Sequence, residues 1–255
     1  MARVLITGST AGLGRAAARH LLEGGHQVVL HARNPARAGR VDDLARRAAG
    51  VVVGDLASAE ETCAVADQVN AIGGIDAVIH NAAIYVDSRR VATPEGHART
   101  LAVNVLAPYM LTARIDRPSR LVYMSSGMHE DGEASLRDID WTARRWDGVQ
   151  AYCDSKLFIT ALAFAVGRRW PDVCTNAVDP GWVPTRMGGP AAPDDLGLGH
   201  RTQTWLAVSD DSEATGNGGY WYHQCRRSPA PAALDESFQD ALLDELIGLT
   251  AVRLP

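Results

Sequence analysis

The chain has 255 residues, a length that suits one α/β domain with a sizeable buried core. Its formal net charge of −5 gives no electrostatic footprint for nucleic acid or an anionic membrane, so neither is an expected partner. Four scattered cysteines and the lack of an HxxxH or HExxH pair argue against a disulfide framework and a metal site. No signal peptide or apolar run of membrane-spanning length is recognisable, so we expect a cytoplasmic protein.

The first half of the chain alternates short apolar runs with helical patterns. A glycine turn follows the first run, and Gly24-Gly25 close the alanine-rich helix after it. Ser58 and Glu61 form a capping-box pattern at the start of a later helix. The expected strands are 3–7, 26–32, 50–56 and 75–82, and the expected helices are 14–25, 35–48 and 58–72.

The second half continues this alternation. A helix is expected over 93–112, with Thr93 as its N-cap and Pro94 in its first turn. The helix expected over 149–170 is apolar nearly all round, which predicts burial on several sides. The remaining expected elements are strands at 119–126, 173–181 and 218–225 and an amphipathic helix at 235–249.

This order of elements predicts an α/β fold: one Rossmann domain over 1–255, with a doubly wound parallel sheet of about seven strands flanked by helices. The least regular segments, 127–148 and 181–202, each follow a strand directly. Ligands of open α/β sheets bind outside the carboxyl ends of the strands. We therefore expect these two segments to form the walls of a substrate site.

The turn after the first strand, "TGSTAGLG", contains Gly8, Gly12 and Gly14. Glycines at this point allow a tight turn and let a pyrophosphate approach the free N–H groups of the following helix. The GxxxGxG spacing differs from the GxGxxG fingerprint, and a flexible strand–helix turn is the simpler explanation. The strand–turn–helix context favours a nucleotide cofactor.

The end of the second strand indicates which cofactor to expect. Enzymes that select NAD place an acidic residue there to bond the ribose 2′-hydroxyl, whereas an arginine accommodates a 2′-phosphate. Here the strand ends in "LHARN", with Arg33 and no nearby carboxylate. NADP(H) is therefore favoured over NAD(H), unless Arg33 is merely an exposed residue before the next helix.

Lys156 is the only lysine of the chain and lies four residues after Tyr152. Residues four apart share one face of a helix, so the two side chains point the same way. A neighbouring ammonium favours the phenolate, and it is expected to lower the pKa of the tyrosine towards the range that acid–base catalysis requires. Arginine would supply the charge on a wider, planar group, which is not equivalent.

These residues resemble the short-chain dehydrogenase/reductase family along essentially the whole chain. "TGSTAGLG" is similar to its TGxxxGxG loop, "GDLAS" to its DL motif, "HNAA" to NNAG, "YCDSK" to YxxxK and "DPGWVPT" to PGxVxT. The stretch "AYCDSKL", the long gap between the serine strand and Tyr152, and the ending "GGYWYHQCRRSPAPAALDE" suggest the branch of retinol dehydrogenase-like and protochlorophyllide reductase-like enzymes. Ala83 replaces the glycine of NNAG, so close cofactor approach there is less assured.

The resemblance implies a role for each matching residue. Tyr152 would be the general acid in carbonyl reduction, and Lys156 would lower its pKa and hold the nicotinamide ribose. Ser126, with Ser125 as the alternative, would hydrogen-bond the substrate carbonyl. Asn104 would position a water in a proton relay, although it could also simply bond a backbone carbonyl. The cofactor-binding positions implied are Gly8, Ser9, Thr10, Gly12, Leu13, Gly14, Arg33, Asp55, Leu56, Asn81, Ala82, Ala83, Lys156, Pro180, Gly181, Val183 and Thr185.

The expected activity is interconversion of a carbonyl and an alcohol on a small molecule. Reduction of a C=C bond and a non-catalytic nucleotide-binding regulator are the alternatives, and the spacing of the glycine loop disfavours sugar-nucleotide epimerases. Trp141, Trp146 and Trp182 lie in the expected substrate loops, which indicates either an apolar or aromatic ligand or packing against the sheet. Arg186 is a candidate contact to a polar substrate group. The family's usual dimer helix ends early here, so both a homodimer and a monomer are expected possibilities.

Overall fold

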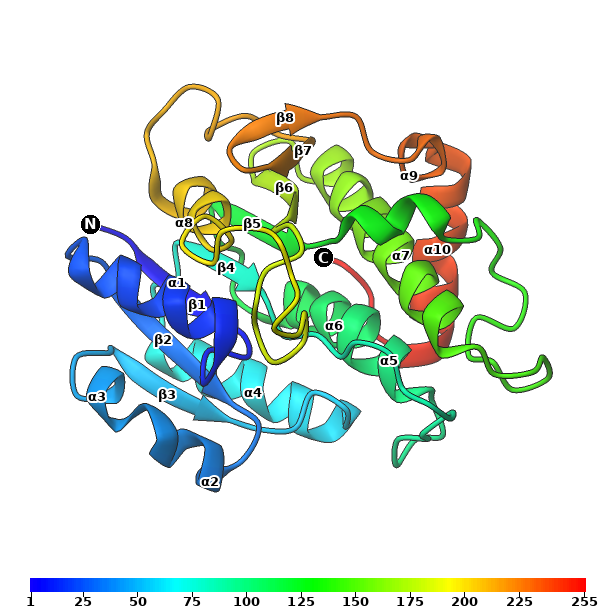
Figure 1. The fold of residues 1–255 in the computed structure, drawn as a ribbon, viewed down its shortest axis with the longest axis horizontal. Helices are drawn as coiled ribbons and strands as arrows, with labels where there is room; N and C mark the ends of the chain where they lie inside the picture. Colours follow the sequence, from blue (N-terminus) through cyan, green and yellow to red (C-terminus); the bar gives the residue numbers. More distant parts are fainter.

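The computed structural model describes residues 1–255 and contains one eight-stranded sheet (Figure 1). Its parallel strands are β1 (Arg3–Ile6), β2 (Gln27–Ala32), β3 (Gly50–Val53), β4 (Ala77–His80), β5 (Arg120–Met124), β6 (Cys174–Asp179) and β7 (Gly219–Tyr222). The strand β8 (Cys225–Arg227) pairs antiparallel with β7. The strand order is β3-β2-β1-β4-β5-β6-β7-β8, which confirms the doubly wound parallel fold and adds one edge strand.

Helices cover both faces of this sheet. They are α1 (Gly12–Glu23), α2 (Pro35–Ala38), α3 (Asp42–Ala45), α4 (Ala59–Ile72), α5 (Arg99–Leu101), α6 (Ala107–Arg114), α7 (Gly148–Arg169), α8 (Arg201–Val208), α9 (Pro231–Leu234) and α10 (Glu236–Thr250). Successive residues of a strand point to opposite faces. Accordingly Leu5 packs in the core under α4, α6 and α7, whereas Val4 and Ile6 pack in the core under α1 and α8.

The helix α7 lies in the middle of the larger core, and Figure 1 shows it beside the C-terminal helix α10. By length and composition α7 could cross a membrane, but 83% of its apolar window is buried inside the fold. An all-round apolar surface is typical of such a buried helix. The predicted burial of 149–170 is therefore confirmed.

The helix expected over 93–112 begins later than predicted. Residues 93–97 form a turn in which Thr93 N–H donates to the His97 carbonyl at 2.8 Å, and Gly96 adopts a positive φ of 93°. The helix starts only at Arg99 and passes through a π-helical segment, Ala102–Leu106, before α6. The Asp140 carboxylate explains the late start, because it accepts the Ala98 N–H at 2.6 Å and so satisfies a backbone donor at the helix end.

Three other elements differ from the expectations. The helix predicted over 35–48 is broken into α2, a 3₁₀ turn that begins at Gly39, and α3, consistent with the low helix propensity of glycine. The strand predicted over 218–225 is a hairpin, because His223 and Gln224 both have positive φ, as a two-residue turn between antiparallel strands requires. The helix α8 was not expected at all.

Candidate active site

A cleft of about 710 Å³ lies at the carboxyl ends of the parallel strands. It spans the point between β1 and β4 where the strand order reverses, which is where doubly wound sheets bind ligands. Predicted site residues that line it are Gly8, Thr10, Gly12, Leu13, Gly14, Arg33, Asp55, Leu56, Asn81, Ala82, Ala83, Tyr152, Lys156, Pro180 and Thr185, with Ser125. Ser9, Asn104, Ser126, Gly181 and Val183 lie outside this lining, as does the whole of 127–148.

Gly8 and Gly14 of the glycine loop are packed so closely that a side chain would not fit at either position. Gly8 has a φ of 65°, and a Cβ there would lie 3.0 Å from the Cα of Ala82. A Cβ on Gly14 would collide with the Asn81 amide. No side chain caps the start of α1 at Ala11, so its first N–H groups stay available beside the cleft. This arrangement fits the pyrophosphate of a dinucleotide.

His31 holds this loop from the second strand and was not predicted as a site residue. Its Nδ1 accepts the Gly8 N–H at 2.9 Å, and its Nε2 donates to the Gly54 carbonyl at 2.9 Å. These bonds assign the neutral tautomer, and burial lowers the pKa of the ring. The Ser9 hydroxyl accepts the His31 N–H at 2.9 Å, so Ser9 acts as a buried anchor. A histidine within the apolar run 28–32 was the available signal in the sequence.

The far end of the cleft, beyond β2 and β3, is exposed and basic. Arg33 has a side chain that is 54% exposed and lies 4.0 Å from the Asp55 carboxylate. Arg37 and Arg186 line the same end, and the pKa of Arg37 is lowered by repulsion from Arg40, followed by partial desolvation and repulsion from Arg186 and Arg33. Arg186, a candidate contact for the substrate, therefore lies among the arginines near Arg33.

The opposite end of the cleft is buried. Tyr152 is only 5% exposed and Lys156 only 3%, and both project from α7. The Lys156 Nζ donates to the Met124 carbonyl at 2.8 Å and lies 5.5 Å from the centre of the Tyr152 ring. The Tyr85 and Tyr152 rings pack nearly perpendicular to each other, with 4.8 Å between ring centres. The spacing of four residues thus brings phenol and ammonium together, as predicted.

Burial dominates the electrostatics of this pair. It raises the pKa of Tyr152, and a hydrogen bond from Ser126 opposes this shift without overcoming it. Burial also lowers the pKa of Lys156 to about 8. The expected fall in the pKa of Tyr152 is therefore wrong for the protein alone, because removal of the phenol from water disfavours its ionised form.

The two serines after β5 have different surroundings. The Ser125 hydroxyl bonds the Thr160 hydroxyl at 2.6 Å inside the protein. The Ser126 hydroxyl accepts the Met128 N–H at 3.3 Å and also reaches Tyr152. Ser125 therefore lines the cleft with its hydroxyl already bonded to Thr160, whereas Ser126 lies outside the lining and interacts with Tyr152.

Asn104 lies in the π-helical segment and is buried. Its amide exchanges two hydrogen bonds with the backbone of Ile84, at 2.8 and 2.9 Å, and donates to the Ser155 hydroxyl at 3.0 Å. These contacts tie the segment after β4 to α7. The simpler of its two predicted roles, bonding to a backbone carbonyl, is the one seen here.

The segment after β6 covers the cleft only in part. Thr185, Arg186 and Met187 line it, whereas Val183 is buried below and Gly181 turns the chain with a φ of 83°. Trp182 is 58% exposed, and its indole N–H donates to the Gly188 carbonyl at 2.8 Å. Met187 lines the cleft next to Arg186, whereas Trp182 lies outside the cleft lining.

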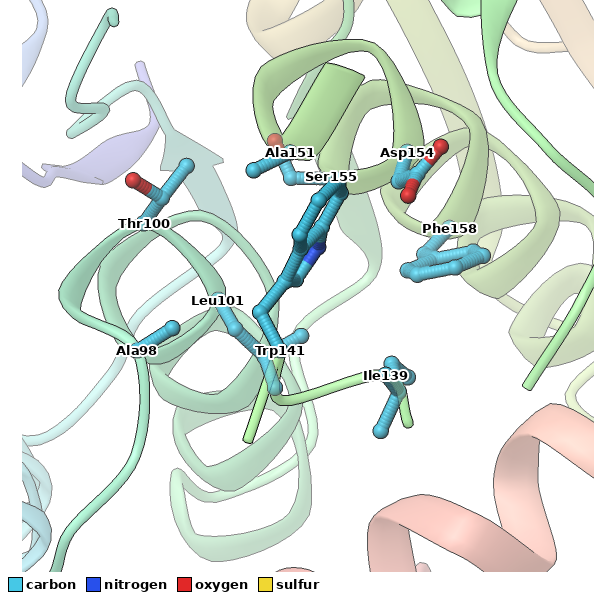
Figure 2. Close-up of a pocket in the computed structure, with 9 residues that line it drawn as sticks. All are labelled: Ala98, Thr100, Leu101, Ile139, Trp141, Ala151, Asp154, Ser155 and Phe158. Atoms are coloured by element: carbon cyan, nitrogen blue, oxygen red, sulfur yellow. The ribbon is translucent and has the colours of Figure 1, made fainter. Parts of the chain in front are cut away.

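Trp141 and Trp146 pack inside the protein instead. Figure 2 shows Trp141 between Leu101 of α5 and Ser155 of α7, beside an internal void of about 10 Å³. The Arg144 guanidinium stacks on the Trp141 ring at 3.5 Å, and Trp146 donates its indole N–H to the Asp87 carbonyl at 2.9 Å. For these two tryptophans the packing alternative is confirmed.

Known proteins resemble the chain along its full length. A family model described as Enoyl-(Acyl carrier protein) reductase matches residues 8–208. Short-chain dehydrogenase chry4 of Gibberella zeae is 40% identical over 261 residues, which cover 100% of this chain and 99% of that protein. "Putative daunorubicin C-13 ketoreductase DnrU" of a Streptomyces species is 35% identical, with 89% of this chain and 84% of that protein covered. Retinol dehydrogenase 13 of Mus musculus is 27% identical, with 96% and 84% covered.

Solved structures show the same fold. A crystal structure of an uncharacterised protein of Mycobacterium paratuberculosis superposes with a TM-score of 0.84 at 26% identity, covering 100% of this chain and 95% of that one. The crystal structure of a blue fluorescent protein from a metagenomic library, in complex with NADPH, gives a TM-score of 0.71 at 19% identity, covering 87% and 95%.

Proposed function

Because the chain belongs to the short-chain dehydrogenase/reductase family, we propose that it is an NADP(H)-dependent oxidoreductase that interconverts a carbonyl and an alcohol. The family predicted from the sequence is thereby confirmed, and retinol dehydrogenase 13 among the relatives agrees with the predicted branch. The observation that carries the proposal is one cleft lined by the glycine loop at one end and by Tyr152 and Lys156 at the other.

Each residue has a role in this reaction that follows from its position. Bound NADPH supplies the hydride, and NADP⁺ accepts it in the reverse direction. Tyr152 donates its phenolic proton to the carbonyl oxygen, and Ser126 donates a hydrogen bond to the same oxygen. The Lys156 ammonium supports the developing phenolate, and Asn104 holds the backbone next to the pair in place.

The preference for NADP(H) rests on the arginines at the exposed end. Arg33, Arg37 and Arg186 surround the position that follows β2, and a 2′-phosphate would relieve their mutual repulsion. Asp55 is the one carboxylate lining that end, and it already faces Arg33 at 4.0 Å. A ribose hydroxyl alone would leave this positive charge uncompensated.

We further propose an apolar or aromatic substrate. Two large, exposed apolar side chains line the cleft, Tyr85 against Tyr152 and Met187 next to Arg186, and water would not favour them without a ligand to cover them. The name of the Streptomyces relative, a C-13 ketoreductase, is consistent with a large carbonyl substrate. The substrate carbonyl would lie beside Tyr152, next to the Tyr85 ring.

The proposal is tested by adding NADPH and a panel of ketones and aldehydes and following the loss of NADPH absorbance. We expect turnover with at least one apolar or aromatic carbonyl, and tighter binding of NADPH than of NADH. Binding of NADPH without turnover on any carbonyl would instead support a nucleotide-binding regulator. Equal affinities for the two cofactors would contradict the role of Arg33.

Reduction of a C=C bond is the second candidate, favoured by the description of the matching family model as an enoyl reductase. The same assay separates the two when an α,β-unsaturated ketone is the substrate. Carbonyl reduction gives an allylic alcohol, whereas C=C reduction gives a saturated ketone. Product analysis by mass spectrometry and NMR therefore decides between them.

A further inference from the structure

Asp179, the last residue of β6, faces the turn that carries Ser126. In the sheet its neighbour Val178 accepts the Ser125 N–H at 2.7 Å, which sets the ends of β5 and β6 side by side. One Asp179 carboxylate oxygen accepts the Gly181 N–H at 2.9 Å. The other lies 3.3 Å from where a Cβ on Gly127 would stand, so it is directed at the serine turn.

Charged and titratable groups surround this carboxylate from several elements. The charges that act on the pKa of Asp179 are those of His129 in the 3₁₀ turn after β5, Asp194 in the segment after β6 and His223 in the β7–β8 turn. The charge of Asp179 in turn acts on the pKa values of Tyr220 and Tyr222 of β7 and of Tyr152 and Lys156 of α7. The hydrogen bond of Lys156 goes to a neutral carbonyl, that of Met124. Met124 pairs with Val178 in the sheet, so the Lys156 ammonium is held at the same end of β5 and β6 where Asp179 stands.

We propose that Asp179 is a positioning residue of the active site, whose negative charge keeps Lys156 as an ammonium and Tyr152 as a phenol. This inference rests on the proposed function, since it assigns the resting protonation state of the same catalytic pair. Asp179 directly precedes the Pro180–Thr185 segment that is similar to PGxVxT, and that motif assigns it no role.

The directions of the pKa shifts agree with this geometry. Burial lowers the pKa of Lys156 to about 8, and the charge of Asp179 acts in the opposite direction. The same charge adds to the rise in the pKa of Tyr152 that burial causes. Burial raises the pKa of Asp179 as well, because Asp179 is itself partly withdrawn from water.

In the resulting state Tyr152 is a neutral phenol and Lys156 is a charged ammonium, so both groups hold their titratable protons. A phenol that keeps its proton can donate it to a carbonyl oxygen, whereas oxidation of an alcohol requires a phenolate as the base. The charge of Asp179 therefore favours the resting state needed for carbonyl reduction. Above about pH 8 Lys156 loses its charge, and the rate of reduction is expected to fall.

The single lysine makes a direct test feasible. Isotope-labelled lysine introduces one side-chain NMR signal, and its pH titration reports the pKa of Lys156 without any need for turnover. We expect a midpoint near pH 8 in the wild-type protein. In Asp179→Asn the amide oxygen can still accept the Gly181 N–H, and the midpoint should move down by about half a pH unit or more.

Two matched variants control for changes in structure. Asp179→Glu keeps the charge and should keep the midpoint close to that of the wild type. Asp194→Asn removes a neighbouring carboxylate that acts on Asp179, and it should leave Lys156 almost unchanged. An Asp179→Asn protein that is folded by circular dichroism but has an unchanged Lys156 midpoint would overturn the inference.

A kinetic experiment complements the titration. With a substrate from the carbonyl panel, the high-pH limb of reduction should shift to lower pH in Asp179→Asn and stay in place in Asp194→Asn. If no carbonyl is reduced by the wild-type protein, the proposed function fails, while the NMR titration still decides the role of Asp179.

Discussion

The two ends of the cleft recognise their ligands by opposite means. At the outer end Arg33, Arg37 and Arg186 keep their charges in contact with water, and they need only be close to an anion to attract it. At the inner end Tyr152 and Lys156 are almost fully buried, and burial shifts both of their pKa values. Exposed charge therefore suits the binding of a permanent anion, whereas buried charge suits the control of a proton.

This difference explains the use of two kinds of cation. The guanidinium of arginine keeps its proton at any accessible pH and can bond phosphate oxygens in pairs. The amine of lysine is compact and changes its pKa readily when it is buried. The chain places its only lysine where this property matters, beside the phenol of Tyr152.

The largest expected effect is at the inner end. Tyr152→Phe removes the proton donor but keeps the ring that packs against Tyr85, so kcat/KM should fall by about a hundred- to ten-thousand-fold. Cofactor affinity, measured by fluorescence titration with NADPH, should hardly change. Substantial remaining turnover would show that another group donates the proton.

Replacement of the ammonium by a guanidinium tests the inner end more finely. Lys156→Arg keeps a positive charge, but a planar group must enter a site that is 3% exposed and shaped for one Nζ. We expect kcat to fall by about tenfold or more. Near-normal kcat would mean that charge alone matters, and Lys156→Met, which lacks the charge, gives the reference for its complete loss.

A substitution at the outer end of the cleft should change the affinity for the cofactor and leave the rate of turnover unchanged. Arg33→Ala should weaken NADPH binding by about tenfold, because it removes a charge-assisted contact that is partly screened by water, and NADH binding should stay almost constant. Arg137→Ala, at an exposed position outside the cleft, is the matched control. A similar loss for both cofactors would show that Arg33 stabilises the cleft in general.

Salt should produce the smallest effect. Raising the ionic strength from about 0.01 M to about 1 M shortens the Debye length from about 30 Å to about 3 Å. NADPH binding at the exposed arginines should therefore weaken by a few-fold, while kcat at saturating cofactor stays nearly constant because the inner pair is buried. A parallel drop in kcat would contradict the division between the two ends.

Local sequence patterns were sufficient to predict much of this structure. The alternation of apolar runs gave the parallel strands, and spacing alone placed Tyr152 and Lys156 on one face of a buried helix. The glycines of the first turn were recognised from their spacing, and the close approach of Gly8 to Ala82 gives the physical reason for a glycine at that position. These features depend on neighbours within a few residues or on rules for connecting strands.

Features that depend on distant residues were not predictable in this way. The helix start at Arg99 depends on Asp140, which accepts a backbone N–H from 42 residues away. The raised pKa of Tyr152 depends on how deeply the finished fold buries the phenol. The location of Trp141 beside an internal void depends on packing between α5 and α7. In each case the cause is a tertiary contact.

The buried position of Lys156 also has a consequence for the outer surface of the protein. Since all other basic side chains except histidine are arginines, no lysine amine is exposed to solvent. Reagents and enzymes that acylate, methylate or conjugate lysine side chains therefore find no exposed lysine on the folded protein. Reaction at that amine would report that α7 had separated from β5.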